Sequence, residues 1–195
     1  MNIAPGDDED VLSMEDGAAF EAWLEANHDQ RTSIWLRVAK KASGIPSITT
    51  AEALDVALCF GWIDGQRRAL DRTHFLQRYS PRRPRGTWSQ VNVAKVEALT
   101  AAGRMRPAGL AEVAAAQADG RWDAAYASQR TATMPEDLAA ALAADEAAAT
   151  FFETLGRTDR YAVYLRLMTA RSPEDRAARL TAAVTDLAAS HKVAF

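Results

Sequence analysis

Residues 66–80 read QRRALDRTHFLQRYS and hold two short runs, Gln66–Leu70 and His74–Ser80, with the composition of β-strands. The three residues between them, 71–73, suit a tight connection, so the stretch predicts a β-hairpin. The segment that follows, Pro81–Gly86, contains two prolines, which lack the backbone N–H that a central strand must donate. We expect it to be an extended surface segment.

The residues before the hairpin predict a mixture of helix and strand. Ser13–Ala26 has apolar residues at helical spacing and predicts a first helix. Ser33–Lys40 alternates between two sets of side chains with the period of a strand. A second helix is expected to begin at Thr49 or Thr50, because threonine is a good N-cap, and to end at Gly61. We expect Gly61–Gly65 to form the turn that leads into the hairpin.

From Ser89 onward the pattern is helical to the end of the chain. Ser89, Pro107, Pro135, Asp145, Thr158 and Ser172 each stand where a helix could begin. The fold class is therefore predicted to be α+β. We expect an acidic, disordered N-terminus (1–12), an α+β half with a strand and the arginine-rich hairpin (13–88), and a helical half (89–195). No Gly/Ser-rich linker separates the two halves, so they are expected to pack together.

The hairpin region is the most unevenly charged part of the chain. Between Gly65 and Trp88 there are seven arginines and one aspartate, a net charge of +6, which leaves −9 for the rest of a chain whose formal charge is −3. Packing does not require such a concentration, and crowded guanidinium groups repel unless water, acids or an anionic ligand lies between them. This segment is therefore where we look for a function.

Composition excludes several classes of protein. Hydrophobic content of 48% and charged content of 25% are ordinary for a soluble globular protein. The single cysteine, Cys59, rules out an intramolecular disulfide framework and lies on an apolar helix face, where we expect a core residue. The acidic N-terminus is unlike a secretory signal and no stretch is apolar enough to span a bilayer, so we expect a cytoplasmic protein without membrane insertion, cofactor or metal.

Several motifs resemble the YdeI/OmpD-associated family, also called bacteriocin-protection proteins. They are Ala51–Gly65 (AEALDVALCFGWIDG), Gln77–Pro84 (QRYSPRRP), Trp88–Asn92 (WSQVN), Gly103–Leu110 (GRMRPAGL) and Gly120–Trp122 (GRW), followed by Phe151-Phe152 and the helix pair Tyr161–Leu187. The resemblance covers most of residues 20–190. It implies a role in stress response or bacteriocin protection, and carries no catalytic residues.

The predicted function is non-catalytic binding of a small anionic ligand or an acidic partner. Arginine offers forked donors that match phosphate and carboxylate, and neighbouring aromatic rings can stack on a ligand. Phe75 and Tyr79 share one face of their strand and could form a stacking platform beside Arg78. The candidate ligand-binding residues are Trp62, Asp64, Arg67, Arg68, Phe75, Arg78, Tyr79, Arg82, Arg83, Arg85 and Trp88.

Other interpretations of the same residues stay open. The arginines could form a solvated face that pairs with the acidic helices. Arginines and aromatics in loops also suit single-stranded nucleic acid, although a dedicated binder is usually basic overall and this chain has a pI near 5.7. An enzyme could use Asp64, with His74 or Arg67, in a cleft between the halves. The hairpin could instead be a surface for a partner protein, and the oligomeric state is left open.

A second set of arginines lies in the C-terminal helices. It comprises Arg157, Arg160, Arg166, Arg171, Arg176 and Arg179. Asp159, Glu174 and Asp175 interleave with them, so we expect ordinary ion pairs on helix surfaces.

Overall fold

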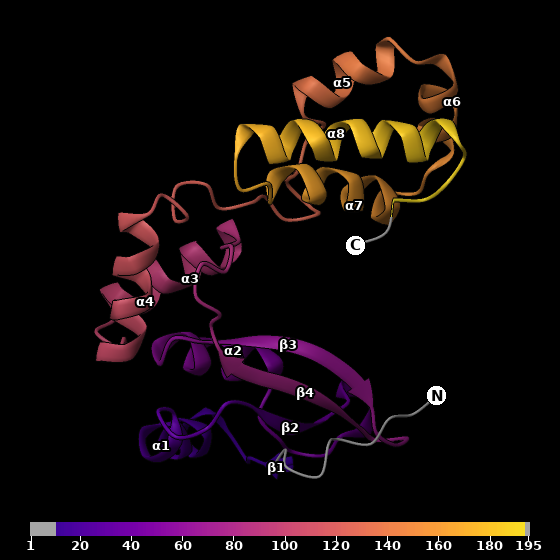
Figure 1. Ribbon diagram of the computed structural model, residues 1–195. Coiled ribbons are helices and arrows are strands. Elements are labelled where there is room, and N and C mark those ends of the chain that lie inside the picture. Colours follow the sequence, from indigo (N-terminus) through magenta and orange to yellow (C-terminus); the bar gives the residue numbers. More distant parts are fainter. Residues whose placement is uncertain (1–10, 194–195) are drawn as a thin grey trace. The chain divides into compact units, whose positions relative to one another are not determined.

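The computed structural model describes residues 11–193 of the 195-residue chain. Contacts divide it into two compact units, one of residues up to Gly86 together with Asn92–Asp123, the other of Thr87–Val91 together with the chain from Ala124. The first contains the sheet and the second is helical (Figure 1), which confirms the α+β class. The boundary expected at residues 88 and 89 remains a prediction. The contacts group the two helices that follow it with the sheet.

The N-terminal unit is built on one four-stranded sheet. Its strands are β1 (Val11–Ser13), β2 (Ile34–Ala39), β3 (Trp62–Ala69) and β4 (His74–Pro81), arranged in the order β1-β2-β4-β3. β1 pairs with β2 in parallel, and the other neighbours are antiparallel. The predicted hairpin is β3 with β4, the long pair of strands in Figure 1.

β3 begins earlier than the sequence suggests. Only Gly61, at φ 75°, has the backbone conformation of a turn, and Trp62 is already paired with Pro81. The register shifts between Asp64 and Arg67, so Gly65 and Gln66 form a β-bulge. Gly61–Gly65, which we expected to be a turn, is therefore mostly strand. Its strand conformation depends on pairing with β4, and the residues of Gly61–Gly65 alone do not indicate that pairing.

The first residues described also differ from expectation. Residues 11 and 12 were expected to be disordered and Ser13 to start a helix, but all three form β1, paired in parallel with β2. The helix α1 (Gly17–Asn27) begins later, because the Asp16 carboxylate caps it by accepting from Ala19 N at 2.9 Å. The rest of the expected acidic tail, residues 1–10, lies outside the described residues.

Helix α2 (Thr50–Cys59) begins where the sequence predicts. Thr49 accepts a hydrogen bond from the backbone of Glu52, and the Glu52 carboxylate accepts from the Thr49 backbone at 2.9 Å, which is a complete capping box. A short 3₁₀ turn (Lys41–Ser43) lies between β2 and this helix. Cys59 at its end is fully buried, and burial raises the pKa of its thiol, so it is a core residue.

The two faces of the sheet have different neighbours. Residues directly opposite each other on paired strands share a face, so Trp62, Tyr79 and Ile34 lie together on the face that α1 covers. There Phe20 of α1 lies 5.6 Å from Tyr79 and Trp23 lies 6.3 Å from Trp62, measured between ring centroids. We call this side the α1 face, and the opposite side, which carries Trp35, the Trp35 face.

Two further helices complete the N-terminal unit, α3 (Gln90–Ala101) and α4 (Pro107–Ala118). α4 packs against α2 so closely that a Cβ added to Gly109 would lie 2.2 Å from the Cys59 carbonyl oxygen. Lys95 of α3 donates to the carboxylate of Asp55 in α2 at 2.5 Å. These contacts explain why both helices belong to the sheet unit.

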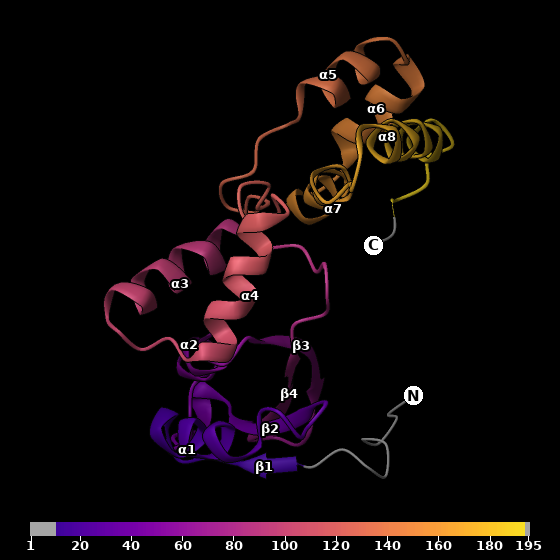
Figure 2. The same ribbon diagram turned by 60° about the vertical axis from the view of Figure 1, so that its left-hand side comes forward.

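The C-terminal unit consists of α5 (Glu136–Ala143), α6 (Glu146–Thr154), α7 (Arg157–Met168) and α8 (Pro173–Ala188), with α8 packed against the other three (Figure 2). Its core comprises Leu138, Leu142, Ala148, Phe152, Leu155, Val163, Leu167, Ala183, Leu187 and Val193. Asp145 caps α6 and Ser172 caps α8, as predicted. The cap of α7 is Gly156 rather than Thr158.

Within residues 11–193, no helix combines the length and the apolar character that crossing a membrane requires. The same residues contain no group of three His, Cys, Asp or Glu side chains arranged to hold a metal ion.

Candidate functional site

The arginines of the hairpin region are distributed by the alternation of the strands. Arg67 pairs in register with Gln77 and lies on the α1 face, whereas Arg68 and Arg78, opposite Leu76 and Trp35, lie on the Trp35 face. Arg72 is exposed at the hairpin tip, and Arg83 and Arg85 are exposed after β4. The seven side chains therefore do not converge on one point.

Arg67 is held in one orientation by two neighbours. Its Nε donates to Gln77 Oε1 at 3.0 Å, and its guanidinium carbon lies 4.5 Å from the centroid of the Phe75 ring. The side chain is exposed, and among residues 11–193 its terminal nitrogens have no hydrogen-bond or ion-pair partner. The forked edge that recognises an anion is thus presented to solvent in a fixed position.

Gln77 is the residue that the sequence analysis missed. It is only 2% exposed, and its side-chain nitrogen donates to the carbonyl oxygen of Gly65 at 2.9 Å and of Gln66 at 3.3 Å. Those carbonyls belong to the β-bulge, so the bulge orients Gln77 and Gln77 orients Arg67. A polar residue between the aromatic residues of one strand face was the only signal of this role.

Asp64 is the carboxylate on which both Arg67 and Arg82 act electrostatically. Close packing around the Asp64 carboxyl raises its pKa above the ordinary value, while Arg67 and Arg82 act in the opposite direction. The side chain nevertheless remains exposed on its outer side. Arg82 was expected on a surface segment but is only 8% exposed, because its backbone N–H donates to the Gly61 carbonyl oxygen at 2.9 Å and ties the chain to the start of β3.

Tyr79 lies beneath these charges. Its side chain is completely buried, and among the described residues its hydroxyl has no hydrogen-bond partner. Burial raises the pKa of this hydroxyl, and the charge of Asp64 adds to the effect. Because α1 covers the ring through Phe20, Tyr79 does not form the open stacking platform that its alternation with Phe75 suggested.

On the Trp35 face, arginine covers an aromatic ring. The guanidinium carbon of Arg68 lies 4.5 Å from the centroid of Trp35, which is 1% exposed. The contact spans the central strand β4, so Arg68 shields the indole from water while its charge faces the ring. Arg78, in register with Trp35, is half-buried on the same face. Both arginines therefore lie on the side of the sheet opposite to Arg67.

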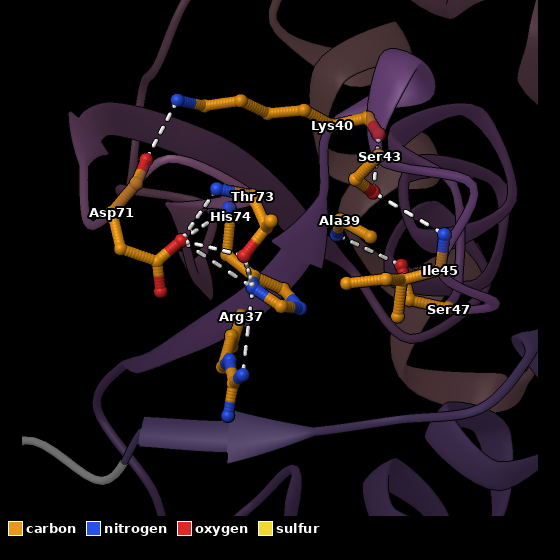
Figure 3. Close-up of polar contacts among 9 residues, drawn as sticks. All are labelled: Arg37, Ala39, Lys40, Ser43, Ile45, Ser47, Asp71, Thr73 and His74. Atoms are coloured by element: carbon orange, nitrogen blue, oxygen red, sulfur yellow. Dashed lines mark hydrogen bonds and ion pairs between the residues drawn. The ribbon is translucent and has the colours of Figure 1, made fainter.

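The hairpin tip is a compact hydrogen-bond network (Figure 3). The Asp71 carboxylate accepts from the backbone N–H of Thr73 and of His74, both at 2.7 Å, and from the Thr73 hydroxyl at 2.8 Å. These bonds hold the pKa of Asp71 well below its usual range. Lys40 donates to the Asp71 carbonyl oxygen at 2.7 Å, and Arg37 reaches the His74 ring at 3.4 Å.

His74 is part of this network. The ring is 7% exposed, and its Nδ1 lies 2.8 Å from the Thr73 hydroxyl and 3.6 Å from Asp71 Oδ1. The local contact between His74 and Asp71 expected from the sequence is therefore present. Asp64, the other acid considered as a partner of His74, lies on the α1 face, whereas His74 lies on the Trp35 face.

The two candidate tryptophans are buried. Trp62 is 1% exposed, packs against Trp23 and donates its indole N–H to the His28 carbonyl oxygen at 3.3 Å. Trp88 is 2% exposed, and its carbonyl oxygen accepts from the backbone of Tyr126 at 3.0 Å within the C-terminal unit. Of the eleven candidate residues, the structure thus brings together Asp64, Arg67, Phe75, Tyr79 and Arg82.

Comparison with known families matches two parts of the chain. Residues 12–112 match a domain of unknown function, DUF8412, and residues 131–190 match the family described as bacteriocin-protection, YdeI or OmpD-associated. Neither a curated protein nor a solved structure matches the chain. The motifs at 51–65, 77–84 and 103–110 fall within the first match, and Tyr161–Leu187 within the second. The chain therefore belongs to the DUF8412 family through residues 12–112, and residues 131–190 match the YdeI/OmpD-associated bacteriocin-protection family that its motifs resemble.

Proposed function

We propose that this protein binds a small anionic ligand without catalysing a reaction, and that Arg67 is the anchor of the site. The observation that carries the proposal is the fixed guanidinium of Arg67, held by Gln77 and Phe75, with terminal nitrogens that have no partner among residues 11–193. A guanidinium oriented before binding loses less side-chain entropy when an anion arrives.

Arg82 and Asp64 set the local charge of this site. Two guanidinium groups and one carboxylate leave a net charge of +1 while Asp64 is ionised, which favours a small anion. The bulge at Gly65 and Gln66 supports the arrangement, since bulges commonly re-aim side chains beside functional sites. Residues 131–190 match a family described as bacteriocin-protection, and on that description we propose that the binding serves a protection response. A cytoplasmic location is part of this proposal.

A calorimetric titration of the full chain tests this function. The probes are inorganic sulfate, a nucleoside monophosphate, a sugar phosphate and a short single-stranded oligonucleotide, each at low and high salt. The Arg67→Gln variant is expected to bind the preferred anion at least about tenfold more weakly, as loss of a charge-assisted hydrogen bond predicts. Arg72→Gln is the matched control, since it removes the same charge from the exposed tip of the same hairpin.

Two outcomes would contradict the proposal. One is equal binding by Arg67→Gln and Arg72→Gln, and the other is that none of the probes shows saturable binding. Tight binding to the oligonucleotide alone, with a steep dependence on salt, would instead assign the hairpin to nucleic acid.

A further inference from the structure

The five arginines on α7 and α8 fall into two groups. Three are paired with carboxylates at 2.7–3.4 Å, in the pairs Arg166–Asp186, Arg176–Asp137 and Arg179–Asp175. Arg157 and Arg160, which lie on the same helix as Arg166, have no carboxylate partner among the described residues. The expectation of ion pairs on helix surfaces therefore holds for the first group and not for these two.

Main-chain carbonyls hold Arg157 and Arg160 in place instead. Arg157 donates to the Gln129 carbonyl oxygen at 3.1 Å. Arg160 donates to the carbonyl oxygens of Leu155, at 3.0 Å, and Glu153, at 2.8 Å, and its guanidinium carbon lies 5.3 Å from the Phe152 ring centroid. Carbonyl oxygens orient a guanidinium without cancelling its charge, so both groups stay cationic and fixed.

These side chains line a cavity of about 310 Å³, near the lower end of ligand-pocket sizes. Arg130 also lines it and, among residues 11–193, has no hydrogen-bond or ion-pair partner. Leu155, Tyr161 and Tyr164 supply an apolar and aromatic wall, and no carboxylate side chain is among the lining residues. The nearby acid Asp159 is paired with Lys192 at 2.8 Å. The cavity thus combines three arginines with two tyrosines.

The backbone around the cavity fixes its two sides. The Tyr161 hydroxyl donates to the Ala127 carbonyl oxygen at 3.0 Å, and the Gln129 side chain donates to the Thr158 hydroxyl at 3.1 Å, so the segment before α5 is tied to the first turns of α7. The N-cap of α7, Gly156, has no side chain to satisfy the first backbone N–H groups of this twelve-residue helix. The positive end of the helix therefore reinforces the three arginines.

We infer that this cavity is a binding site for a small phosphomonoester whose organic part is flat and largely apolar. The three arginines match the charge and the acceptor oxygens of a phosphate dianion. The tyrosines and Leu155 suit a ring of about the size of benzene, which the cavity can hold together with the phosphate group. This cavity is independent of the site proposed at Arg67, since all its lining residues belong to the C-terminal unit.

The test is a calorimetric titration of the full chain with phenyl phosphate, inorganic phosphate and phenol at low salt. Phenyl phosphate is expected to bind most tightly, inorganic phosphate more weakly and phenol not measurably. Arg130→Gln is expected to weaken binding of phenyl phosphate by about tenfold or more, because it removes a charge-assisted contact. It should leave the unliganded melting temperature unchanged, because Arg130 makes no hydrogen bond or ion pair among the described residues and its side chain is exposed.

Two further variants assign the binding to a site. Arg166→Gln, the matched control on α7, removes an arginine that is already paired and is expected to bind like the wild type. Arg67→Gln in the hairpin is also expected to keep its affinity for phenyl phosphate. Loss of binding in Arg67→Gln but not in Arg130→Gln would place the phosphate in the hairpin and overturn the inference. So would equal affinities of phenyl phosphate for Arg130→Gln and wild type, or equal affinities of phenol and phenyl phosphate.

Discussion

At the scale of single residues, the hairpin shows how one arginine differs from its neighbours in sequence. Arg67 and Arg68 are adjacent, yet one presents its guanidinium to solvent beside Phe75 and the other covers Trp35 on the opposite face. The alternation of a strand separates them, and buried Gln77 fixes the first. Local charge density is therefore a poor guide to which arginine can bind a ligand.

We expect Asp64 to make the affinity for an anion at Arg67 depend on pH. Since its pKa is raised, Asp64 begins to take up a proton at a higher pH than an ordinary aspartate, and the local charge then rises from +1 to +2. We predict that affinity for sulfate, which stays a dianion, increases as the pH falls from neutral through this pKa. Asp64→Asn is expected to bind sulfate more tightly than wild type at neutral pH, with a flat profile.

The same shift has a defined consequence for stability. The folded protein disfavours the charged form of Asp64, so this cost is absent well below the unfolded pKa and present above the folded one. Asp64→Asn should therefore be at least as stable as wild type at neutral pH, measured by thermal unfolding. This role for Asp64 would be contradicted if Asp64→Asn bound sulfate more weakly than wild type and its sulfate affinity depended on pH as that of the wild type does.

Gln77 is predicted to act on the ligand only through Arg67. Gln77→Leu keeps a side chain of similar size but removes the acceptor for Arg67 Nε, and it leaves the bulge carbonyls without their donor. We expect it to weaken anion binding several-fold and to lower stability by about 1–3 kcal/mol, because buried polar groups lose their partners. Gln77→Glu, which restores an acceptor for Arg67, should recover orientation of the arginine but add an opposing charge. Calorimetry and chemical denaturation of both variants separate the two effects.

At the scale of secondary-structure elements, caps and glycines decide where helices begin and end. Asp16, Thr49, Asp145 and Ser172 each accept a backbone hydrogen bond at the start of a helix. β1 has no such local signal, and its three residues are ordered by pairing with β2. α4, α5 and α7 start without a side-chain cap, and the first residues of α7 line the cavity that holds Arg130, Arg157 and Arg160.

The capping box of α2 is predicted to contribute to stability in a way that acid removes. Thr49→Ala should destabilise the protein by about 1 kcal/mol, measured by urea unfolding. The hydrogen bonds from Thr49 lower the pKa of Glu52, so their contribution is present above the unfolded pKa and is lost as the pH falls through the folded one. The difference between Thr49→Ala and wild type should consequently shrink in acid. A difference that is constant from neutral to acidic pH would show that the hydrogen bond from the Thr49 hydroxyl to Glu52 contributes nothing, since the bond from the backbone N–H of residue 49 is kept in the variant.

At the scale of the whole molecule, each unit has its own core and its own arginines that we propose bind an anion. In the N-terminal unit the sheet, α1 and α2 are joined by α4, which approaches α2 through Gly109. In the C-terminal unit four helices bury a leucine-rich core. The family comparisons follow a similar division, with one match over residues 12–112 and the other over 131–190.

The contact of α4 with α2 makes Gly109 a sensitive position. Gly109→Ala places a methyl group against the Cys59 carbonyl oxygen, where the backbone itself must move. We predict a loss of about 2 kcal/mol or more in unfolding free energy, despite the higher helix propensity of alanine. Ala115→Ser, on the exposed side of the same helix, should change stability by less than about 0.5 kcal/mol. Equal stability of the two variants would show that α4 does not depend on this close approach.

The sequence by itself determined the α+β class, the hairpin, most helix starts and the family, because apolar periodicity, capping residues and long motifs are local properties of the chain. It also located the positive charge, but could not say which guanidinium groups would be free. That was decided only by tertiary structure, since β4 orients Arg67 through Gln77 and α1 buries Tyr79. The cavity with Arg130, Arg157 and Arg160 was equally invisible, because the choice between a carboxylate and a main-chain carbonyl as partner depends on distant segments meeting in space.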